Sequence, residues 1–193
     1  TSQMERALDR LGRQHYRVDG FVTKPDEAVT KLRPIDDPMI GLYTHWVYGP
    51  HTVDGVIGKN NPLLMASNFS GTFPGLVGLL NTGACLQAEG RAHSRAWTDT
   101  DDWTEDDQFL ERLDQWCREG VVEDDTSSVH QGPDLSTDAG VLVQQVHGTM
   151  AEAWPLILML GDTSMGMTNG YFGTRTLHEI GFLEHKVDQA WIM

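Results

Sequence analysis

The sequence has little positive charge. It contains 14 Lys and Arg residues against 28 Asp and Glu residues, which gives a formal net charge of −14 over 193 residues. Nucleic acids and anionic membrane surfaces are bound by basic protein faces, so the composition argues against both as main partners. An excess of acidic residues is typical of a solvated surface that keeps a protein in solution.

Cysteine is scarce, and long apolar runs are missing. The two cysteines, Cys85 and Cys117, stand in apolar, helix-like segments and cannot form a disulfide framework, so we expect both to be reduced and buried. No apolar run approaches the roughly 20 residues of a membrane-spanning helix, and the first residues lack the apolar core of a signal peptide. We therefore expect a cytoplasmic protein that makes no membrane contact.

Motifs for several common kinds of chemistry are also missing. The sequence has no G-x-G-x-x-G pattern, no P-loop lysine and no G-x-S-x-G turn. None of the eight histidines forms an H-x-H or H-x-x-x-H pair, and no C-x-x-C pair exists. These absences argue against nucleotide, zinc and serine-hydrolase sites. We assign no catalytic residue and no metal ligand in this chain.

Apolar, strand-like runs alternate with helical patterns along the chain. Strands are expected at 16–22, 38–44, 62–67 and 156–160, and the main helices at 4–14, 24–32, 75–90, 105–119 and 171–180. Because continuous apolar strands that alternate with helices form parallel sheets covered on both faces, the pattern predicts an α/β fold.

Two segments bear on the organisation of this fold. The helix at 75–90 is apolar nearly all the way round, which predicts burial on most sides, with Gly78 and Gly83 tolerated where another backbone packs closely. The segment 122–150 is rich in polar residues and is interpreted as a linker or insertion. The expected organisation is a first α/β domain at 1–121, this linker, and the beginning of a second α/β domain at 151–193.

Three of the expected strands end in conspicuous sequences, THWVYG, SNFSGTFPG and GDTSMGMTNG. Ligands of parallel sheets bind at the carboxyl ends of strands. Trp46 and Tyr48, with His45 beside them, could stack on the C–H face of a sugar there, or they could pack under a loop. Asp162 directly follows a core strand, where it could bind a ligand or cap its own loop.

Three segments together resemble the L-fucose and L-arabinose isomerase family. THWVYGPHTVDG resembles the family's Cys-Trp-Cys-Tyr-Gly segment, TFPGLVGLLNTGACLQAEGRAHSRAWTD resembles the Pro-Gly helix that follows, and GDTSMGMTNGYFGTRTLHEIGFLEHKVDQAW resembles the Ser-Met-Gly turn that opens the second domain. The resemblance implies a flavodoxin-like first domain with helices on both faces of a parallel sheet, followed by the start of a second α/β domain.

The resemblance also implies a function. The family isomerises aldoses to ketoses through an enediol at a Mn²⁺ ion held by two carboxylates and a histidine, which lie in later parts of the family's chain. We therefore expect this chain alone to be inactive. Trp46 matches a tryptophan that reaches a neighbouring subunit's sugar site, and Met165 matches a methionine that lines the pocket. The expected role is to form part of a sugar pocket and of an oligomer interface, with the rest of the enzyme or neighbouring subunits as partners. The alternative is a non-catalytic α/β binding or assembly module.

Overall fold

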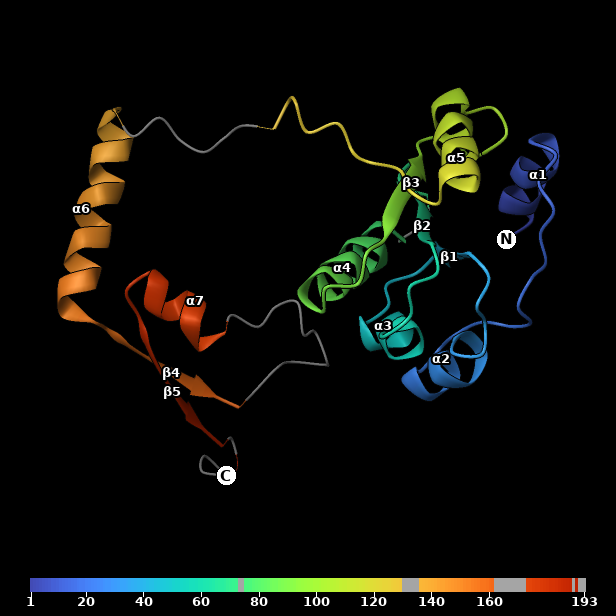
Figure 1. The fold of residues 1–193 in the computed structure, drawn as a ribbon. Helices are drawn as coiled ribbons and strands as arrows, with labels where there is room; N and C mark the ends of the chain where they lie inside the picture. The colour runs from blue at the N-terminus through green and yellow to red at the C-terminus, as the bar shows by residue number, and fades with distance from the viewer. Residues whose placement is uncertain (73–74, 130–135, 162–172, 189, 191–193) are drawn as a thin grey trace. The chain divides into compact units, whose positions relative to one another are not determined.

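The computed structural model describes residues 1–72, 75–129, 136–161, 173–188 and 190 (Figure 1). The chain divides into two compact units. The first unit covers Thr1–Asp124, and the second contains the described residues that follow Asp124. Each unit is built around its own parallel sheet.

The sheet of the first unit has three parallel strands in the order β1-β2-β3. The strands are β1 (Met39–Tyr43), β2 (Leu63–Asn68) and β3 (Ser94–Thr98). All six residues of β2 are buried, because this strand lies between the other two and both of its faces are covered. The fully buried central strand explains why its sequence, LLMASN, is apolar over most of its length.

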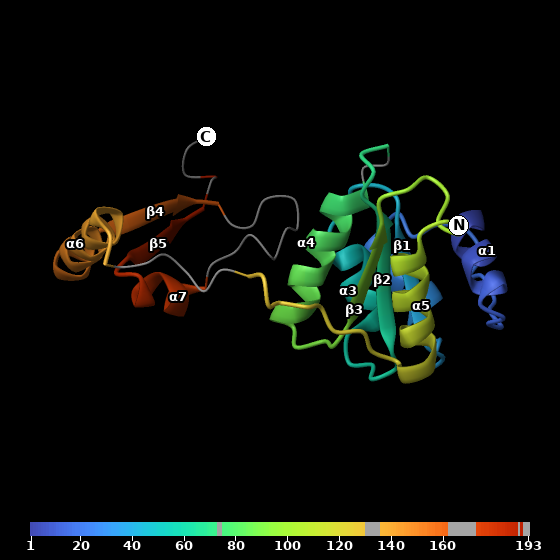
Figure 2. The same ribbon diagram turned by 90° about the horizontal axis from the view of Figure 1, so that it is seen from above.

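Helices cover both faces of this sheet. They are α1 (Ser2–Arg10), α2 (Pro25–Leu32), α3 (Pro50–Val56), α4 (Gly75–Ala88) and α5 (Asp107–Glu119). Figure 2 shows α4 and α5 on opposite sides of the strands. Alternate residues of β2 therefore enter different cores: Leu64 packs in a cluster with residues of α1 and α5, and Met65 packs in a cluster with residues of α3 and α4. This arrangement confirms the predicted α/β class and is compatible with a flavodoxin-like fold.

In this unit one predicted strand is absent from the structure, and one observed strand was not predicted. Residues 16–22 form no strand, and Tyr16 and Phe21 are 64% and 75% exposed. The aromatic residues that suggested a strand here lie at the surface, and the Tyr16 hydroxyl donates a hydrogen bond to Asp37. Strand β3 was not predicted, because its buried residues are the small Ser94, Ala96 and Thr98 rather than large apolar ones.

The second unit contains α6 (Asp138–Ala153), β4 (Leu156–Leu160), α7 (Thr174–Glu179) and β5 (Leu183–Val187). Strands β4 and β5 pair in parallel. Helix α6 lies mostly within the segment interpreted as a linker, and its N-cap Thr137 accepts a hydrogen bond from the Gly140 amide.

The prediction of a strand at 156–160 is confirmed, but the prediction that this strand is buried is wrong. Leu156, Leu158 and Leu160 of β4 are between 54% and 62% exposed. In the part of the chain that the structure describes, this strand has a single partner strand, and the side of the sheet that carries these three leucines is open.

The sequence predicted two buried cysteines and no membrane-spanning helix. Cys85 is buried as expected, whereas Cys117 is only partly buried. Among the described residues, no helix combines the length and the apolar character that crossing a bilayer requires.

Candidate ligand-binding site at the carboxyl edge of the first sheet

The segment that follows β1 is held against α4 by its backbone. The Asn81 side-chain amide donates a hydrogen bond of 2.9 Å to the Val47 carbonyl oxygen. A Cβ atom at Gly78 would lie 2.5 Å from the His45 carbonyl oxygen, so only glycine lets the two backbones approach this closely. The predicted backbone contact at Gly78 is confirmed. At Gly83 it is wrong, because the nearest atoms there belong to the side chains of His93 and Met65.

The aromatic side chains of this segment lie together at the surface. The ring centroids of Trp46 and Tyr48 are 5.5 Å apart, with the ring planes tilted by 55°. Trp46 is 50% exposed, and His45 is exposed beside it, so the indole does not pack into the interior of this chain. Between the two alternatives for Trp46, a surface aromatic group and a core residue under a loop, the structure has the first.

His51 belongs to this cluster although the sequence did not single it out. Its ring centroid lies 5.7 Å from that of Tyr48. Its Nδ1 lies 3.1 Å from the Tyr48 carbonyl oxygen and its Nε2 lies 2.9 Å from the Thr23 carbonyl oxygen. Because both ring nitrogens contact the backbone, His51 anchors the aromatic cluster. Its spacing of three residues from Tyr48 was the available signal.

The neighbouring strand end carries a closed network of polar groups. Ser67 Oγ donates a hydrogen bond of 2.8 Å to the Tyr43 carbonyl oxygen, which ties the end of β2 to the end of β1. Asn68 is 2% exposed; its amide donates to the Thr100 carbonyl oxygen, and its Oδ1 accepts from the Ser70 amide. These bonds fix the loops that follow β2 and β3. The sequence showed only that SNFSG follows an expected strand, and it did not predict these bonds.

Tyr43, the last residue of β1, is a structural group. Its hydroxyl lies 3.0 Å from Thr52 Oγ1, and burial raises the pKa of the phenol to about 12. The hydroxyl therefore stays protonated at neutral pH and is not available as a base.

Other groups of the described chain do not add chemistry to this edge. Two surface hollows of about 530 and 260 Å³ are lined by Asp9 and residues 12–15, and by residues of the loops 57–60 and 89–92; neither includes Trp46. In the second hollow, the buried Arg91 donates to the carbonyl oxygens of Val56, Asn61 and Ala92, so its charge serves the fold.

The structure does not bring together all the residues predicted for the site. His45, Trp46 and Tyr48 lie in one segment, as their sequence numbers require, and His51 joins them. Asp162 and Met165 lie outside the described residues. The arrangement offers an exposed indole, a tilted phenol and an imidazole at the carboxyl edge of a parallel sheet, which is a surface that can bind an apolar face of a ligand.

Comparisons with protein-family models, with curated proteins and with solved structures found no match to this chain. The class of the protein therefore comes from its geometry. Over its described residues it is an α/β protein with a three-stranded parallel sheet between helices and a second, two-stranded parallel sheet.

Proposed function

We propose that this chain is the N-terminal part of an aldose–ketose isomerase like the L-fucose and L-arabinose isomerases, and that it forms one wall of the sugar pocket and part of an oligomer interface. The observation that supports the sugar wall is Trp46, a half-exposed indole at the carboxyl edge of the first sheet. Its backbone neighbours are fixed on α4 through Gly78 and Asn81. The two cysteines of the chain, Cys85 and Cys117, are too few for a disulfide framework, which suits a cytoplasmic location.

The chemistry of this segment suits a neutral, hydroxyl-rich ligand. An indole buries the C–H face of a sugar ring, while the sugar hydroxyls remain free to bond elsewhere. Between Thr44 and Pro50 the chain has no acidic residue, lysine or arginine, so the segment offers no fixed charge to an anionic or cationic ligand. Loss of the aromatic face should weaken sugar binding by about 1–2 kcal/mol, or roughly tenfold.

The manganese ion of the resemblance is not assigned to this chain. Among the described residues, no group of three or more His, Cys, Asp or Glu side chains is placed to hold a metal ion. The described residues therefore do not fit a Mn²⁺ site. Their proposed part is to bind and orient the sugar.

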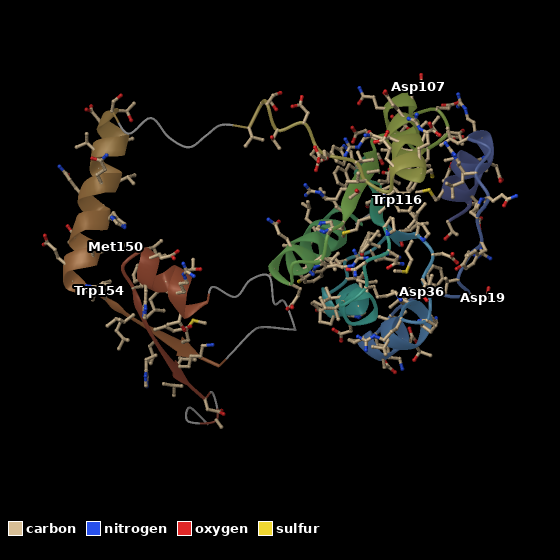
Figure 3. All side chains as sticks on the ribbon, viewed as in Figure 1. Asp19, Asp36, Asp107, Trp116, Met150 and Trp154 are labelled. Carbon is tan, nitrogen blue, oxygen red and sulfur yellow. The ribbon has the colours of Figure 1, made fainter. Side chains whose placement is uncertain are left out.

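Saturation-transfer difference NMR with L-fucose and L-arabinose tests the sugar wall directly. The chain should transfer saturation to the sugar C–H protons, and Trp46→Ala should abolish most of this signal. Trp154→Ala is the matched control, because Trp154 is 44% exposed and lies at the end of α6 (Figure 3). An equal signal from the Trp46→Ala protein and the unchanged protein would rule out the proposed role of Trp46.

An assay of ketose formation tests the isomerase itself. With L-fucose and Mn²⁺, an enzyme that contains this chain should form the ketose, and Trp46→Ala should raise its KM roughly tenfold. The isolated chain should form none.

The alternative, a non-catalytic α/β binding or assembly module, is favoured by a different observation. Helix α4 leaves Leu76, Val77 and Leu80 partly exposed, which suits a surface for protein association. Absence of both sugar binding and ketose formation, in a chain that still associates, would favour this alternative.

A further inference from the structure

We propose that the open edge of β1 is the docking site for one further parallel strand, and that the polypeptide leading into α1 supplies this strand. The open edge consists of the backbone N–H and C=O groups of Ile40 and Leu42. The docked strand would lie between β1 and residues 16–22, which would pair with its far side. This inference goes beyond the proposed function, and its test uses neither sugar nor metal.

The backbone of β1 is paired along one edge. The Met39 amide donates a hydrogen bond of 2.9 Å to the Pro62 carbonyl oxygen, which leads into β2. Because the backbone groups of successive residues in a strand point to opposite edges, those of Ile40 and Leu42 point away from β2. Among the described residues, β2 is the one strand that pairs with β1. An unpaired strand edge is a template for another strand.

The opposite edge of the same sheet, at β3, is protected. The Arg112 guanidinium of α5 donates a hydrogen bond of 2.8 Å to the Arg95 carbonyl oxygen, and both arginines pair with Asp124. Charged side chains of this kind prevent pairing at an edge strand. The sequence of β1, MIGLY, contains no charged residue. The β1 edge is therefore the one that is suited to accept a strand.

The helices that precede β1 lie on opposite faces of the sheet. Helices α3 and α4, which join the three strands, share one face (Figure 2). Helix α2 packs closely on α3, since a Cβ atom at Gly55 would lie 2.5 Å from the Ala28 carbonyl oxygen. Helix α1 lies on the other face, where its Met4, Ala7 and Leu8 pack in one cluster with residues of α5.

These faces determine the strand order, because crossovers between parallel strands are right-handed. In this sheet a right-handed crossover from β1 towards β2 places its helix on the α3 face, and a crossover in the opposite direction places it on the α5 face. Helix α2 leads into β1 on the α3 face, so residues 16–22, which precede α2, belong beyond the open edge. Helix α1 leads into residues 16–22 on the α5 face, so a strand that precedes α1 belongs between them and β1.

The direction of α1 agrees with this order. Arg6 contacts Asp102, which follows β3 at the carboxyl edge, and Arg13 contacts Asp114 within α5. Helix α1 therefore begins at the carboxyl edge and runs antiparallel to the strands, as α5 does. A parallel strand beside β1 would end at this same edge, so a short loop would connect it to Ser2.

Residues 16–22 lie on the β1 side of the sheet and are not paired with it (Figure 1). The Tyr16 hydroxyl donates a hydrogen bond of 3.0 Å to the side chain of Asp37, just before β1, so the contact is made through side chains. Gly20 has a φ angle of +74°, which bends the segment. Because glycine also adopts the extended conformation readily, the segment can become a strand without strain.

The position beside β1 suits an apolar strand of about five residues. Both of its faces would be covered, one by α1 and the other by α2 and α3, and strands covered on both faces are mostly apolar. Ile40 and Leu42 are partly buried against the core cluster that contains α1 and α5. The docked strand would cover the rest of these two side chains.

Amide hydrogen exchange, measured by NMR, tests the open edge. In the chain as it stands, the Ile40 and Leu42 amides should exchange faster than the Gly41 and Tyr43 amides, which point to β2. A chain extended before Thr1 by about five valine and isoleucine residues and a Gly-Asn turn should show the Ile40 and Leu42 amides slowed roughly tenfold or more. The matched control carries proline at the centre of the extension, since proline cannot donate a ladder hydrogen bond.

Two substitutions in the extended chain test the far side of the docked strand. Successive amides point to opposite edges, so one of Val18→Pro and Asp19→Pro removes a donor that faces the docked strand and the other does not. One variant should lose the protection of residues 16–22, and the other should keep most of it. Neither should release the Ile40 and Leu42 amides.

A separate peptide replaces the extension if the extended chain does not fold. The same apolar residues between two pairs of lysines, added to the unchanged chain, should slow the Ile40 and Leu42 amides in proportion to the bound fraction. The peptide with a central proline is again the control.

Four results would overturn the proposal. The first is equal exchange of the Ile40 and Gly41 amides in the unextended chain, which would mean that the edge is already covered. The second is an extension and a peptide that both leave Ile40 and Leu42 unchanged, and the third is equal protection by the proline control. The fourth is protection of Ile40 that rises with protein concentration in the unextended chain, which would identify a second copy as the occupant.

Discussion

Strands β2 and β4 have similar sequences and opposite surroundings. β2, LLMASN, lies between two strands and beneath helices on both faces, and all of its residues are buried. β4, LILML, pairs with β5, and its three leucines are more than half exposed. An apolar run therefore predicts that a strand forms, but burial depends on the elements that cover it, which the run itself does not specify.

The two regions should differ most in how much stability is lost when a leucine is replaced by alanine. Leu64 of β2 is fully buried and Leu158 of β4 is 54% exposed. Leu64→Ala should lower the free energy of unfolding of the first unit by about 3 kcal/mol, because it leaves a cavity in a packed core. Leu158→Ala should lower that of the second unit by less than about 1 kcal/mol. Hydrogen-exchange mass spectrometry reports both units in the same molecule.

Equal losses for the two variants would contradict this comparison and would mean that β4 is covered in solution. Leu158→Lys sharpens the test. A lysine is tolerated on an open face and strongly destabilising in a core, so a large loss of protection in β4 and β5 would again indicate a covered face.

The strands illustrate how much of the fold was predictable. β1, β2 and β4 were found because large apolar residues dominate each run, and α/β class followed from their alternation with helices. β3 pairs with β2, as β1 does, but it carries Arg95 and Trp97 between small buried residues, so its apolar content was too low to predict a strand. The segment 16–22 has aromatic and branched residues typical of a strand, but no strand among the described residues pairs with it.

The candidate site was predictable in position and less so in contacts. The place of Trp46 after an apolar strand put it at the carboxyl edge, where the structure has it. The contact of His51 with Thr23 joins residues 28 positions apart and depends on how α2 and α3 pack. The open outer face of α4 was missed, because periodicity shows that a helix is apolar but not which side finds a cover.

A buried phenol provides the second prediction, which concerns alkaline pH. The pKa of Tyr43 is raised by burial from 10.0 to about 12. The folded state therefore binds the phenolic proton more tightly than the unfolded state, so this contribution to stability is fully present below pH 10 and is lost as pH rises from 10 to about 12. The loss should reach about 2–3 kcal/mol and should affect the first unit.

Unfolding by urea, followed at several pH values between about 9 and 12, checks this expectation. Tyr43→Phe removes the titrating group, so its stability should fall less steeply with pH, although the lost contact with Thr52 lowers it at neutral pH. Parallel pH profiles for the two proteins would show that Tyr43 is not the buried group that titrates.

The third prediction compares two helical glycines. A Cβ at Gly78 of α4 would lie 2.5 Å from the His45 carbonyl oxygen, whereas a Cβ at Gly148 of α6 would meet no atom within 4 Å. Gly78→Ala should therefore destabilise the first unit by about 2 kcal/mol, since the segment that carries Trp46 must shift. Gly148→Ala should stabilise α6 by up to about 1 kcal/mol, because alanine is the better helix former.

Hydrogen exchange of α4 and α6 measures both changes in stability, and hydrogen exchange of residues 44–48 reports the shift of the segment that carries Trp46. A Gly78→Ala protein as stable as the unchanged protein would mean that the 44–48 segment is not held on α4 and that its aromatic cluster is not fixed.

The smallest expected effect comes from ion pairs. Asp124, the last residue of the first unit, contacts Arg95 of β3 at 2.7 Å and Arg112 of α5 at 2.6 Å, and its side chain is 27% exposed. In α7 of the second unit, Arg175 and Glu179 form a pair whose side chains are 92% and 61% exposed.

Asp124→Asn should lower the stability of the first unit by about 1 kcal/mol, because one partly buried carboxylate neutralises two guanidinium groups that would otherwise face each other. Glu179→Gln should produce no measurable change, since an exposed pair is screened by water and salt. Urea titrations of the two variants at low and high NaCl provide the measurement.

Asp124 links a strand to a helix, so its loss should also increase hydrogen exchange at the start of the 125–129 segment. If both substitutions leave stability unchanged, the first unit does not depend on its boundary ion pairs, and the contrast between the units comes from apolar burial alone.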